Sequence, residues 1–497
     1  MSEQIVKRVV IAGGGTAGWV AAAALVKQLG PLIDITLVES DEIGTVGVGE
    51  STIPTSRSFH ELLGINEPAF MRATQATFKL GIAFENWGQI GDRYIHSFGE
   101  IGKRSTWMAD FHHFWLEAQA QGFGGSLADY CFELQASAAG KFAKADGLAI
   151  NYAYHLDATL YARFLRGLAE PAGVRRVEGK IAQVEQHPET GFIEALVLES
   201  GVRVEGDLFL DCTGFRALLI EQTLHSGYED WSRYLPTNSA FAVQTRSTGP
   251  AIPLTRAIAH EAGWRWRIPL QHRVGNGIVF CSDFMSDEDA RTKLLNDIEG
   301  DALIEPRLIR YQTGARRKVW NKNCVALGLA SGFIEPLEST SIHLVKVAVT
   351  RLVQLFPFGG CDEAVANRFN AQSRHELEGI RDFITLHYHL TRRDDSPFWD
   401  RCRTMEIPDS LAERMALFRD AAHAYQEGND LFRVDSWVQV LLGQGLAPAS
   451  YHRLARMMDP GELRGALAAL KSNIQAAVAR MPSHQEFLAQ YCPAGDA

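Results

Sequence analysis

The strongest constraint on the fold lies near the start of the chain, where an apolar run meets closely spaced glycines. The segment KRVVIAGGGTAGWVAAAALVKQLG has β-branched residues before Gly13 and Ala-rich helix formers after Gly18. This order predicts a strand, a tight turn and a helix whose N-terminal N–H groups donate hydrogen bonds to a pyrophosphate. The predicted dinucleotide contacts are Gly13, Gly15, Thr16, Ala17 and Gly18.

A second predicted strand, IDITLVE, ends at Glu39. This carboxylate follows the glycines at about the 20-residue spacing at which an acid meets a ribose 2′-hydroxyl. A lone glycine motif is common, but strand, glycines, helix, strand and acid in this order are specific. We therefore expect an adenine dinucleotide at this position.

Two later segments indicate which dinucleotide binds. GDLFLDCTGF (206–215) and NCVALGLASGFIEP (323–336) each read as an apolar strand that runs into small residues. An FAD-binding fold returns to its cofactor from distant parts of the chain, whereas a nicotinamide site needs one compact module. We therefore predict FAD, with Leu329 and Pro336 among its contacts.

A glycine-rich loop, GTVGVGESTIP (44–54), follows the second strand and suits backbone contact with the flavin or its phosphates. Its predicted cofactor contacts are Gly49 and Ser51. Only one dinucleotide signature occurs in the chain, so no separate nicotinamide site is expected.

The composition excludes several classes of protein. The 497 residues are 46% apolar and 22% charged with a net charge of -10, which is typical of globular proteins and unlike nucleic-acid binders. The longest apolar run, WVAAAALV, is too short to span a bilayer, and the N-terminus enters a strand pattern without a signal peptide. Seven scattered cysteines without CxxC spacing indicate reduced thiols in a cytoplasmic protein. The histidines lack zinc-site spacing, so no metal is expected.

The predicted fold is α/β. It combines an FAD-binding Rossmann-like module of the glutathione-reductase and monooxygenase type with a packed, mainly helical substrate module. We place a discontinuous FAD-binding module with inserted substrate-covering segments at 1–360, and a helical module that completes the substrate pocket at 361–497. In the second module, Ser410 and Glu413 form a candidate capping box, and GELRGALAALKSNIQAAVARM predicts a helix.

The segment GWRWRIP contains W-x-W-x-I-P, formed by Trp264, Trp266, Ile268 and Pro269. Together with GGGTAG, GVGESTIP and GFIEPLEST, it closely resembles the flavin-dependent tryptophan halogenase family over nearly the whole chain. The resemblance implies that reduced FAD from a separate reductase reacts with O2 and that halide is oxidised to hypohalous acid. The bulk of the two tryptophans then separates the flavin from the substrate pocket.

The resemblance also implies a catalytic pair. Lys79, in ATFKLGIAFENW, matches the family's catalytic lysine and stands between apolar neighbours. Desolvation favours the amine form of a lysine, which suits a group that hydrogen-bonds hypohalous acid or captures it as a haloamine. Glu338 is the implied partner that orients the electrophile and takes the proton lost from the ring.

Halide binding is implied at Thr340 and Ser341, because hydroxyl residues ahead of a helix mark a terminus with free N–H groups. The family usually has glycine where this chain has Ser341, which alters the lining of the halide site. Bromide gives up its hydration and is oxidised more readily than chloride, so we expect bromide to be favoured and chloride to be possible.

The substrate side follows the same resemblance. YIHSFG matches the wall of the aromatic site and gives His96 and Phe98, and FRDAAHAYQEGNDLF offers Glu427 and Phe432. Family members that take free tryptophan carry a tandem tyrosine in this region, which this chain lacks. We therefore expect a small indole-type substrate, and a homodimer is possible.

Two alternatives stay open at this point. One is a single-component flavin monooxygenase or reductase with the same nucleotide fold, and the other is a non-enzymatic FAD-binding protein. Turnover of a nicotinamide by the protein alone favours the first, and lack of any turnover favours the second.

Overall fold

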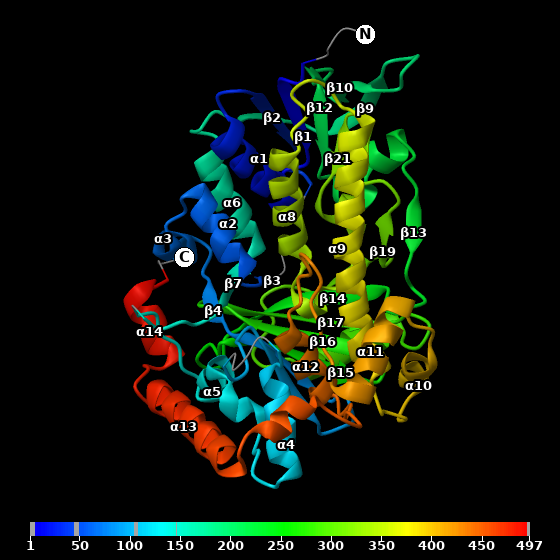
Figure 1. The fold of residues 1–497 in the computed structure, drawn as a ribbon. Helices are drawn as coiled ribbons and strands as arrows, with labels where there is room; N and C mark the ends of the chain where they lie inside the picture. The colour runs from blue at the N-terminus through cyan, green and yellow to red at the C-terminus, as the bar shows by residue number, and fades with distance from the viewer. Residues whose placement is uncertain (1–4, 44–48, 104–107, 146, 495–497) are drawn as a thin grey trace. The chain divides into compact units, whose positions relative to one another are not determined.

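The computed structural model describes residues 5–43, 49–103, 108–145 and 147–494. The chain divides into two compact units, each assembled from three separate stretches (Figure 1). Unit 1 comprises Met1–Ala76, Leu156–Ser232 and Arg310–Glu378. Unit 2 comprises Thr77–His155, Arg233–Ile309 and Gly379–Ala497. The boundary at residue 360 that we predicted falls within the last stretch of unit 1.

The centre of unit 1 is a six-stranded sheet that is parallel except at one edge. Apolar residues fill its inner strands, as expected for a parallel sheet covered on both faces. In sheet order the strands are β20 (Trp320–Asn321), β21 (Cys324–Ala326), β12 (Leu208–Asp211), β1 (Arg8–Ala12), β2 (Asp34–Glu39) and β8 (Arg175–Glu178). The predicted order of strand, glycine turn, helix and strand is thus present.

Helices and two small sheets complete unit 1. Helix α1 packs against α6 and α8. The helices are α1 (Thr16–Leu29), α2 (Thr55–Leu63), α3 (Glu67–Ala73), α6 (Ala158–Ala169), α8 (Ser341–Gln354) and most of α9 (Glu363–His389). The small sheets are β9 (Ile181–Gln186), β10 (Ile193–Leu198) and β11 (Arg203–Glu205), and β13 (Tyr228–Asp230), β19 (Gly314–Arg316) and β22 (Gly332–Phe333).

Unit 2 is built on a seven-stranded sheet. The sequence predicts this region only as substrate-covering segments inserted into the FAD-binding module. All neighbouring strands of the sheet with a described register are antiparallel except β15 and β5, which run parallel. In sheet order the strands are β18 (Arg307–Arg310), β14 (Ser239–Arg246), β17 (Arg273–Phe280), β16 (Gly263–Pro269), β15 (Leu254–His260), β5 (Gly81–Glu85) and β6 (Arg93–Ser97). A separate pair joins β4 (Thr77–Lys79) to β7 (Ala153–Asp157).

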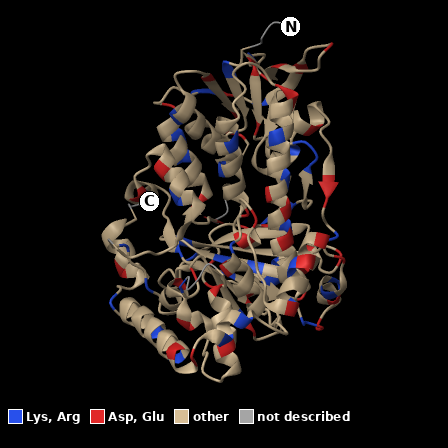
Figure 2. Cartoon of the chain, in the orientation of Figure 1, with Lys and Arg blue, Asp and Glu red and all other residues tan. Residues whose placement is uncertain are grey.

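The later part of unit 2 is helical, so the predicted α/β class with a helical C-terminal region is confirmed. Acidic and basic side chains are interspersed along the helices (Figure 2). The helices are α4 (Phe111–Ala120), α5 (Phe132–Ala138), α7 (Asp287–Asp297), α10 (Pro397–Thr404), α11 (Asp409–Ala421), α12 (Val434–Gly443), α13 (Pro460–Ala479) and α14 (His484–Tyr491). No helix among the described residues is both long and apolar enough to cross a membrane.

The helix predicted from GELRGALAALKSNIQAAVARM is confirmed as α13, but the predicted capping box is wrong. Helix α11 begins at Asp409 after Pro408, so Ser410 is already its second residue. The Ser410 hydroxyl donates to the carboxylate of Asp382, which lies 28 positions earlier in the chain. A tertiary contact therefore uses the hydroxyl that the local pattern assigns to a cap.

One buried carboxylate fixes the chain where it leaves the central sheet. Asp211 ends β12 and is fully buried. Its Oδ1 accepts from the backbone N–H and the hydroxyl of Thr213, at 3.0 and 2.6 Å. Its Oδ2 accepts from the backbone N–H groups of Leu219 and Ile220, at 2.9 and 2.8 Å, at the start of a π-helix. All four groups that contact this carboxylate are hydrogen-bond donors, so the NH2 group of an amide in its place would face a donor.

We predict that Asp211→Asn lowers the free energy of unfolding by about 2–4 kcal/mol, because its amide group faces buried donors that then lack an acceptor. Urea denaturation followed by circular dichroism measures the change. Glu189→Gln, in an exposed turn of the same unit, is the matched control and should leave the midpoint unchanged. An Asp211→Asn midpoint equal to that of the wild type contradicts the assignment.

Candidate active site

The predicted pyrophosphate turn in unit 1 has the geometry that such a ligand needs. Gly13 has φ +108°, and a Cβ there would lie 2.3 Å from the Cys212 carbonyl oxygen, so only glycine fits. A Cβ at Gly18 would lie 1.9 Å from the Gly13 carbonyl oxygen. A Cβ on Gly15 meets nothing within 4 Å, and no side chain caps α1. The N-terminus of α1, with Thr16 and Ala17 in its first turn, is therefore open to an anion, as FAD requires.

Glu39 ends β2 beside this turn, at the predicted place. Its Oε1 accepts from Arg176 Nε at 2.6 Å, and its Oε2 accepts from Trp19 Nε1 at 3.4 Å. A Cβ on Gly14 would lie 1.5 Å from Glu39 Oε2, so the glycine run makes room for the carboxylate. The two donors orient a group suited to receive a ribose hydroxyl.

The other predicted cofactor contacts in unit 1 are placed as follows. Gly49 and Ser51 lie in β3 (Gly49–Ser51), whereas residues 44–48 of the same loop fall outside the described residues. Leu329 lies in a short 3-10 helix, and a Cβ on its neighbour Gly328 would lie 2.9 Å from the Ala17 Cβ. Pro336 begins the 3-10 turn that ends at Glu338. The segment around Leu329 thus returns to the start of α1, as we predicted for an FAD-binding fold.

The predicted halide site lies at the start of α8 in unit 1. Glu338 is buried, and Ser339 turns the chain with φ +61°. Thr340 is the N-cap residue, but its hydroxyl does not cap the helix. This hydroxyl is buried without a hydrogen-bond partner in the described part of the chain, and Ser341 begins the helix. A buried donor beside a helix N-terminus fits a desolvated halide.

Lys79 in unit 2 ends β4 and is fully buried, flanked by buried Phe78 and Leu80. Its Nζ lies 5.1 Å from the centroid of the Phe98 ring, which follows β6. The face of an aromatic ring stabilises a cation, and the effect grows when the cation is desolvated. The structure therefore places the predicted catalytic lysine against one predicted residue of the substrate wall.

A hydrogen-bonded chain ties the lysine's strand to the end of the tryptophan strand. The Thr77 hydroxyl donates to the Pro269 carbonyl at 2.7 Å, so its oxygen receives Nδ1–H of His155 at 3.0 Å. His155 Nε2 then accepts from the Thr255 hydroxyl at 2.9 Å. Burial, followed by the charges of Lys79 and His484, holds the pKa of His155 well below its usual value. The imidazole is therefore neutral. No sequence pattern singles out His155.

The tryptophans alternate with arginines along β16. Trp264 and Trp266 share one face with ring centroids 6.1 Å apart, whereas Arg265 on the other face donates to the Asp297 carbonyl. A Cβ on Gly277 of β17 would lie 2.0 Å from the Trp266 ring, so this glycine seats the indole. Both indole N–H groups are buried without an acceptor among the described residues. Ile268 and Pro269 complete the buried end of the strand.

The predicted substrate residues contribute to an aromatic cluster in unit 2. The Phe383 ring of α9 stacks on Phe432 at 3.7 Å between centroids and lies 5.3 Å from His96 and 4.9 Å from Trp437. Glu427, in contrast, is exposed. Phe383 and Trp437 have no motif of their own, and only apolar helical spacing marks them in the sequence.

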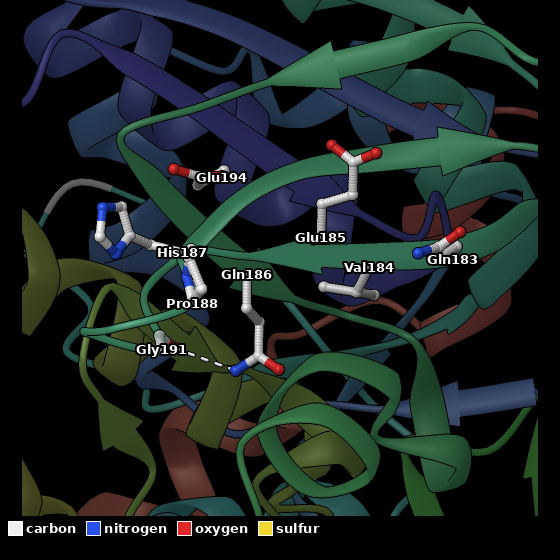
Figure 3. Close-up of a pocket in the computed structure, with 8 residues that line it drawn as sticks. All are labelled: Gln183, Val184, Glu185, Gln186, His187, Pro188, Gly191 and Glu194. Atoms are coloured by element: carbon white, nitrogen blue, oxygen red, sulfur yellow. Dashed lines mark hydrogen bonds between the residues drawn. The ribbon is translucent and has the colours of Figure 1, made fainter.

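Two other features carry none of the predicted site residues. A shallow hollow of about 530 Å³ lies on the β9–β10 hairpin, where Gln186 donates to the Gly191 carbonyl (Figure 3). Its lining is polar and holds no group suited to flavin or halogen chemistry. In the described parts of the chain, no three His, Cys, Asp or Glu side chains gather as a metal requires, and all seven cysteines are free.

Comparison with known proteins identifies the family of the chain. The tryptophan halogenase family profile matches residues 8–460. The chain is 35% identical to the 7-chloro-L-tryptophan 6-halogenase KtzR of Kutzneria sp., over 97% of this chain and 99% of that protein.

Solved structures are also similar over their whole length. The flavin-dependent halogenase Xcc4156 from Xanthomonas campestris has a TM-score of 0.98 and 55% identity, covering 99% of this chain and 100% of that one. BrvH from Brevundimonas sp. BAL3, also a flavin-dependent halogenase, has a TM-score of 0.94 and 44% identity, covering 98% and 99%. Members of this two-component family need a flavin reductase. The chain belongs to the tryptophan halogenase family and is an FADH2-dependent halogenase.

Proposed function

We propose that this halogenase acts on an electron-rich aromatic ring such as indole, with bromide favoured and chloride accepted. The observation that carries the proposal is the fully buried Lys79, whose Nζ lies 5.1 Å from the Phe98 ring. A buried ammonium against an aromatic wall suits the delivery of a polarised electrophile to a ring. Bound reduced FAD, with O2, supplies the oxidising equivalents that turn halide into hypohalous acid.

The step assigned to the chain's own residues is electrophilic substitution. The ring carbon bonds to the halogen, the halogen–oxygen bond breaks, and the ring proton and the hydroxide leave as water. Lys79 either donates a hydrogen bond to the hypohalous oxygen or holds the halogen as a haloamine. Glu338 takes the proton from the ring as it regains aromaticity, a role suited to a buried carboxylate.

We assign FAD binding to unit 1, through the open N-terminus of α1, Glu39, Gly49, Ser51, Leu329 and Pro336. The wall formed by Trp264, Trp266, Ile268 and Pro269 keeps the organic substrate from the flavin. The aromatic cluster with His96, Phe98 and Phe432 receives the ring. A separate reductase supplies FADH2, and we expect a cytoplasmic protein that can form a homodimer.

Removal of the Lys79 side chain tests its proposed role in halogenation. Lys79→Ala should lower halogenation at least about a thousandfold, in the range seen when a group acting on the reacting atoms is removed. Oxidation of reduced FAD by O2 should stay at the wild-type rate, since the lysine acts after the flavin. Product formation by mass spectrometry and flavin absorbance in stopped flow measure the two steps.

The matched control is Lys144→Ala. This exposed lysine of unit 2 also lies over an aromatic ring, 5.3 Å from the Tyr152 centroid. It should keep wild-type halogenation. Near-wild-type product formation by Lys79→Ala removes the lysine from the mechanism.

The source of the electrons can be tested on the purified protein. Because only one dinucleotide signature occurs, the purified protein should oxidise neither NADH nor NADPH above background, and halogenation should depend on added flavin reductase. Absorbance at the nicotinamide band, with and without FAD, tests this. Stoichiometric nicotinamide oxidation by the protein alone contradicts it.

Substrate preference and halide preference can be tested together. Free tryptophan must bury an ammonium and a carboxylate with few partners, and each unpaired charge costs at least about 3 kcal/mol, or roughly a hundredfold in affinity. Indole should therefore be halogenated at least about a hundredfold more efficiently than tryptophan, and bromination should outrun chlorination. Competition between the two substrates, in equal bromide and in equal chloride, measures both ratios.

Ser341→Gly is the variant that tests the halide assignment, because it restores the residue usual in the family. It should shift the bromide-to-chloride product ratio while leaving the preference for indole unchanged. An unchanged ratio removes Ser341 from halide selection, and a wild-type preference for tryptophan contradicts the substrate assignment.

A further inference from the structure

A guanidinium fills a cage of aromatic rings and a carboxylate in unit 2. The Cζ atom of Arg414, on α11, lies 3.9 Å from the centroid of the Tyr425 ring and 4.7 Å from that of Trp437. Its Nη2 donates to Asp430 Oδ2 at 2.8 Å, and its Nη1 donates to the Tyr425 carbonyl at 2.8 Å. The side chains of Arg414 and Asp430 are only 14% and 13% exposed. Two rings and an acid around a cation form the set that recognises organic ammonium ions.

The cage is continuous with the aromatic cluster assigned to the substrate ring. Trp437 contributes to both, since its ring also meets Phe383 edge to face at 4.9 Å. Phe383 in turn contacts His96 and Phe432. Trp437 therefore joins the cage to the cluster that is proposed to hold the substrate ring.

We infer that Arg414 is a specificity-determining residue that occupies the place of a substrate ammonium group. This inference rests on the proposed substrate site. The guanidinium already neutralises the Asp430 carboxylate. A second cation in the cage is therefore repelled by Arg414 and finds no unpaired carboxylate. The wild-type protein thus selects indoles whose side chains carry no positive charge at this end.

The acid of the cage does not depend on Arg414 for its position. Asp430 Oδ2 also accepts from the backbone N–H of Glu427 at 3.1 Å, and the Asp430 carbonyl accepts from Gln426 Nε2 at 2.7 Å. Trp437 is held within α12. Removal of the arginine side chain should therefore leave two rings and a carboxylate in place, now open to a cation from outside.

The test compares two ligands of the same size. Tryptamine carries an ammonium where 3-propylindole carries a methyl group. Isothermal titration calorimetry measures both on the full-length protein with FAD added. The wild type should bind 3-propylindole at least about tenfold more tightly than tryptamine. Arg414→Ala should abolish this preference, because its affinity for tryptamine should rise at least about tenfold, the scale of a desolvated cation–π contact beside a carboxylate.

Two control variants separate the cage from general effects. Arg414→Lys keeps a positive charge beside Asp430 and should show no gain in tryptamine binding. Arg464→Ala removes another arginine of unit 2 that stacks on a ring, at 4.4 Å from the Phe123 centroid, and should keep the wild-type preference. A tryptamine gain in either control overturns the inference.

Equal binding of the two ligands by the wild type also overturns the inference, whatever the variants show. So does an Arg414→Ala protein that folds and keeps the wild-type preference. Circular dichroism establishes whether the variant folds, and the wild-type comparison decides alone where it does not. Calorimetry requires no turnover. Failure of the wild type to halogenate any arene therefore counts against the proposed function and is distinct from failure of the cage.

Discussion

The structure of unit 2 depends on the burial of a cation. Lys79 is fully buried, and removing an ammonium from water costs several kcal/mol unless the surroundings compensate. The face of the Phe98 ring, 5.1 Å from Nζ, offsets about 2 kcal/mol of that cost at a desolvated site. The backbone of Lys79 must also be held in place so that Nζ stays over this ring. The short strand β4 does this by pairing with β7 in register, Lys79 opposite Ala153.

The hydrogen bonds around His155 extend this support to the tryptophan strand. The Pro269 carbonyl can only accept, which fixes the direction of donation from Thr77 and then from His155. A neutral imidazole keeps both ring nitrogens paired and adds no second positive charge beside Lys79. The same chain joins the lysine's strand to the W-x-W-x-I-P segment. Two motifs that are far apart in sequence are thus linked directly by the Thr77 hydroxyl, which His155 and Thr255 support from behind.

The sequence predicts best those features that a short stretch of backbone determines. Gly13 and Gly18 are required by contacts within one turn and with the adjoining strand, so their spacing alone indicates the dinucleotide site. The capping box fails because Asp382 takes the Ser410 hydroxyl from another helix. His155, Phe383 and Arg414 act through partners in other segments of the chain, as distant in sequence as His96 is from Phe383, and no local pattern marks such pairs.

Lys79 and Arg414, both in unit 2, also differ in the chemistry open to them. A guanidinium keeps its charge at any working pH and presents a planar face, which suits Arg414 to a permanent place between Tyr425 and Trp437. An ammonium is compact and can give up its proton when it is desolvated, so a lysine has access to an amine form that an arginine lacks. A haloamine requires that free amine. The residue type at each position therefore fits a division in which arginine shapes the pocket and lysine meets the electrophile.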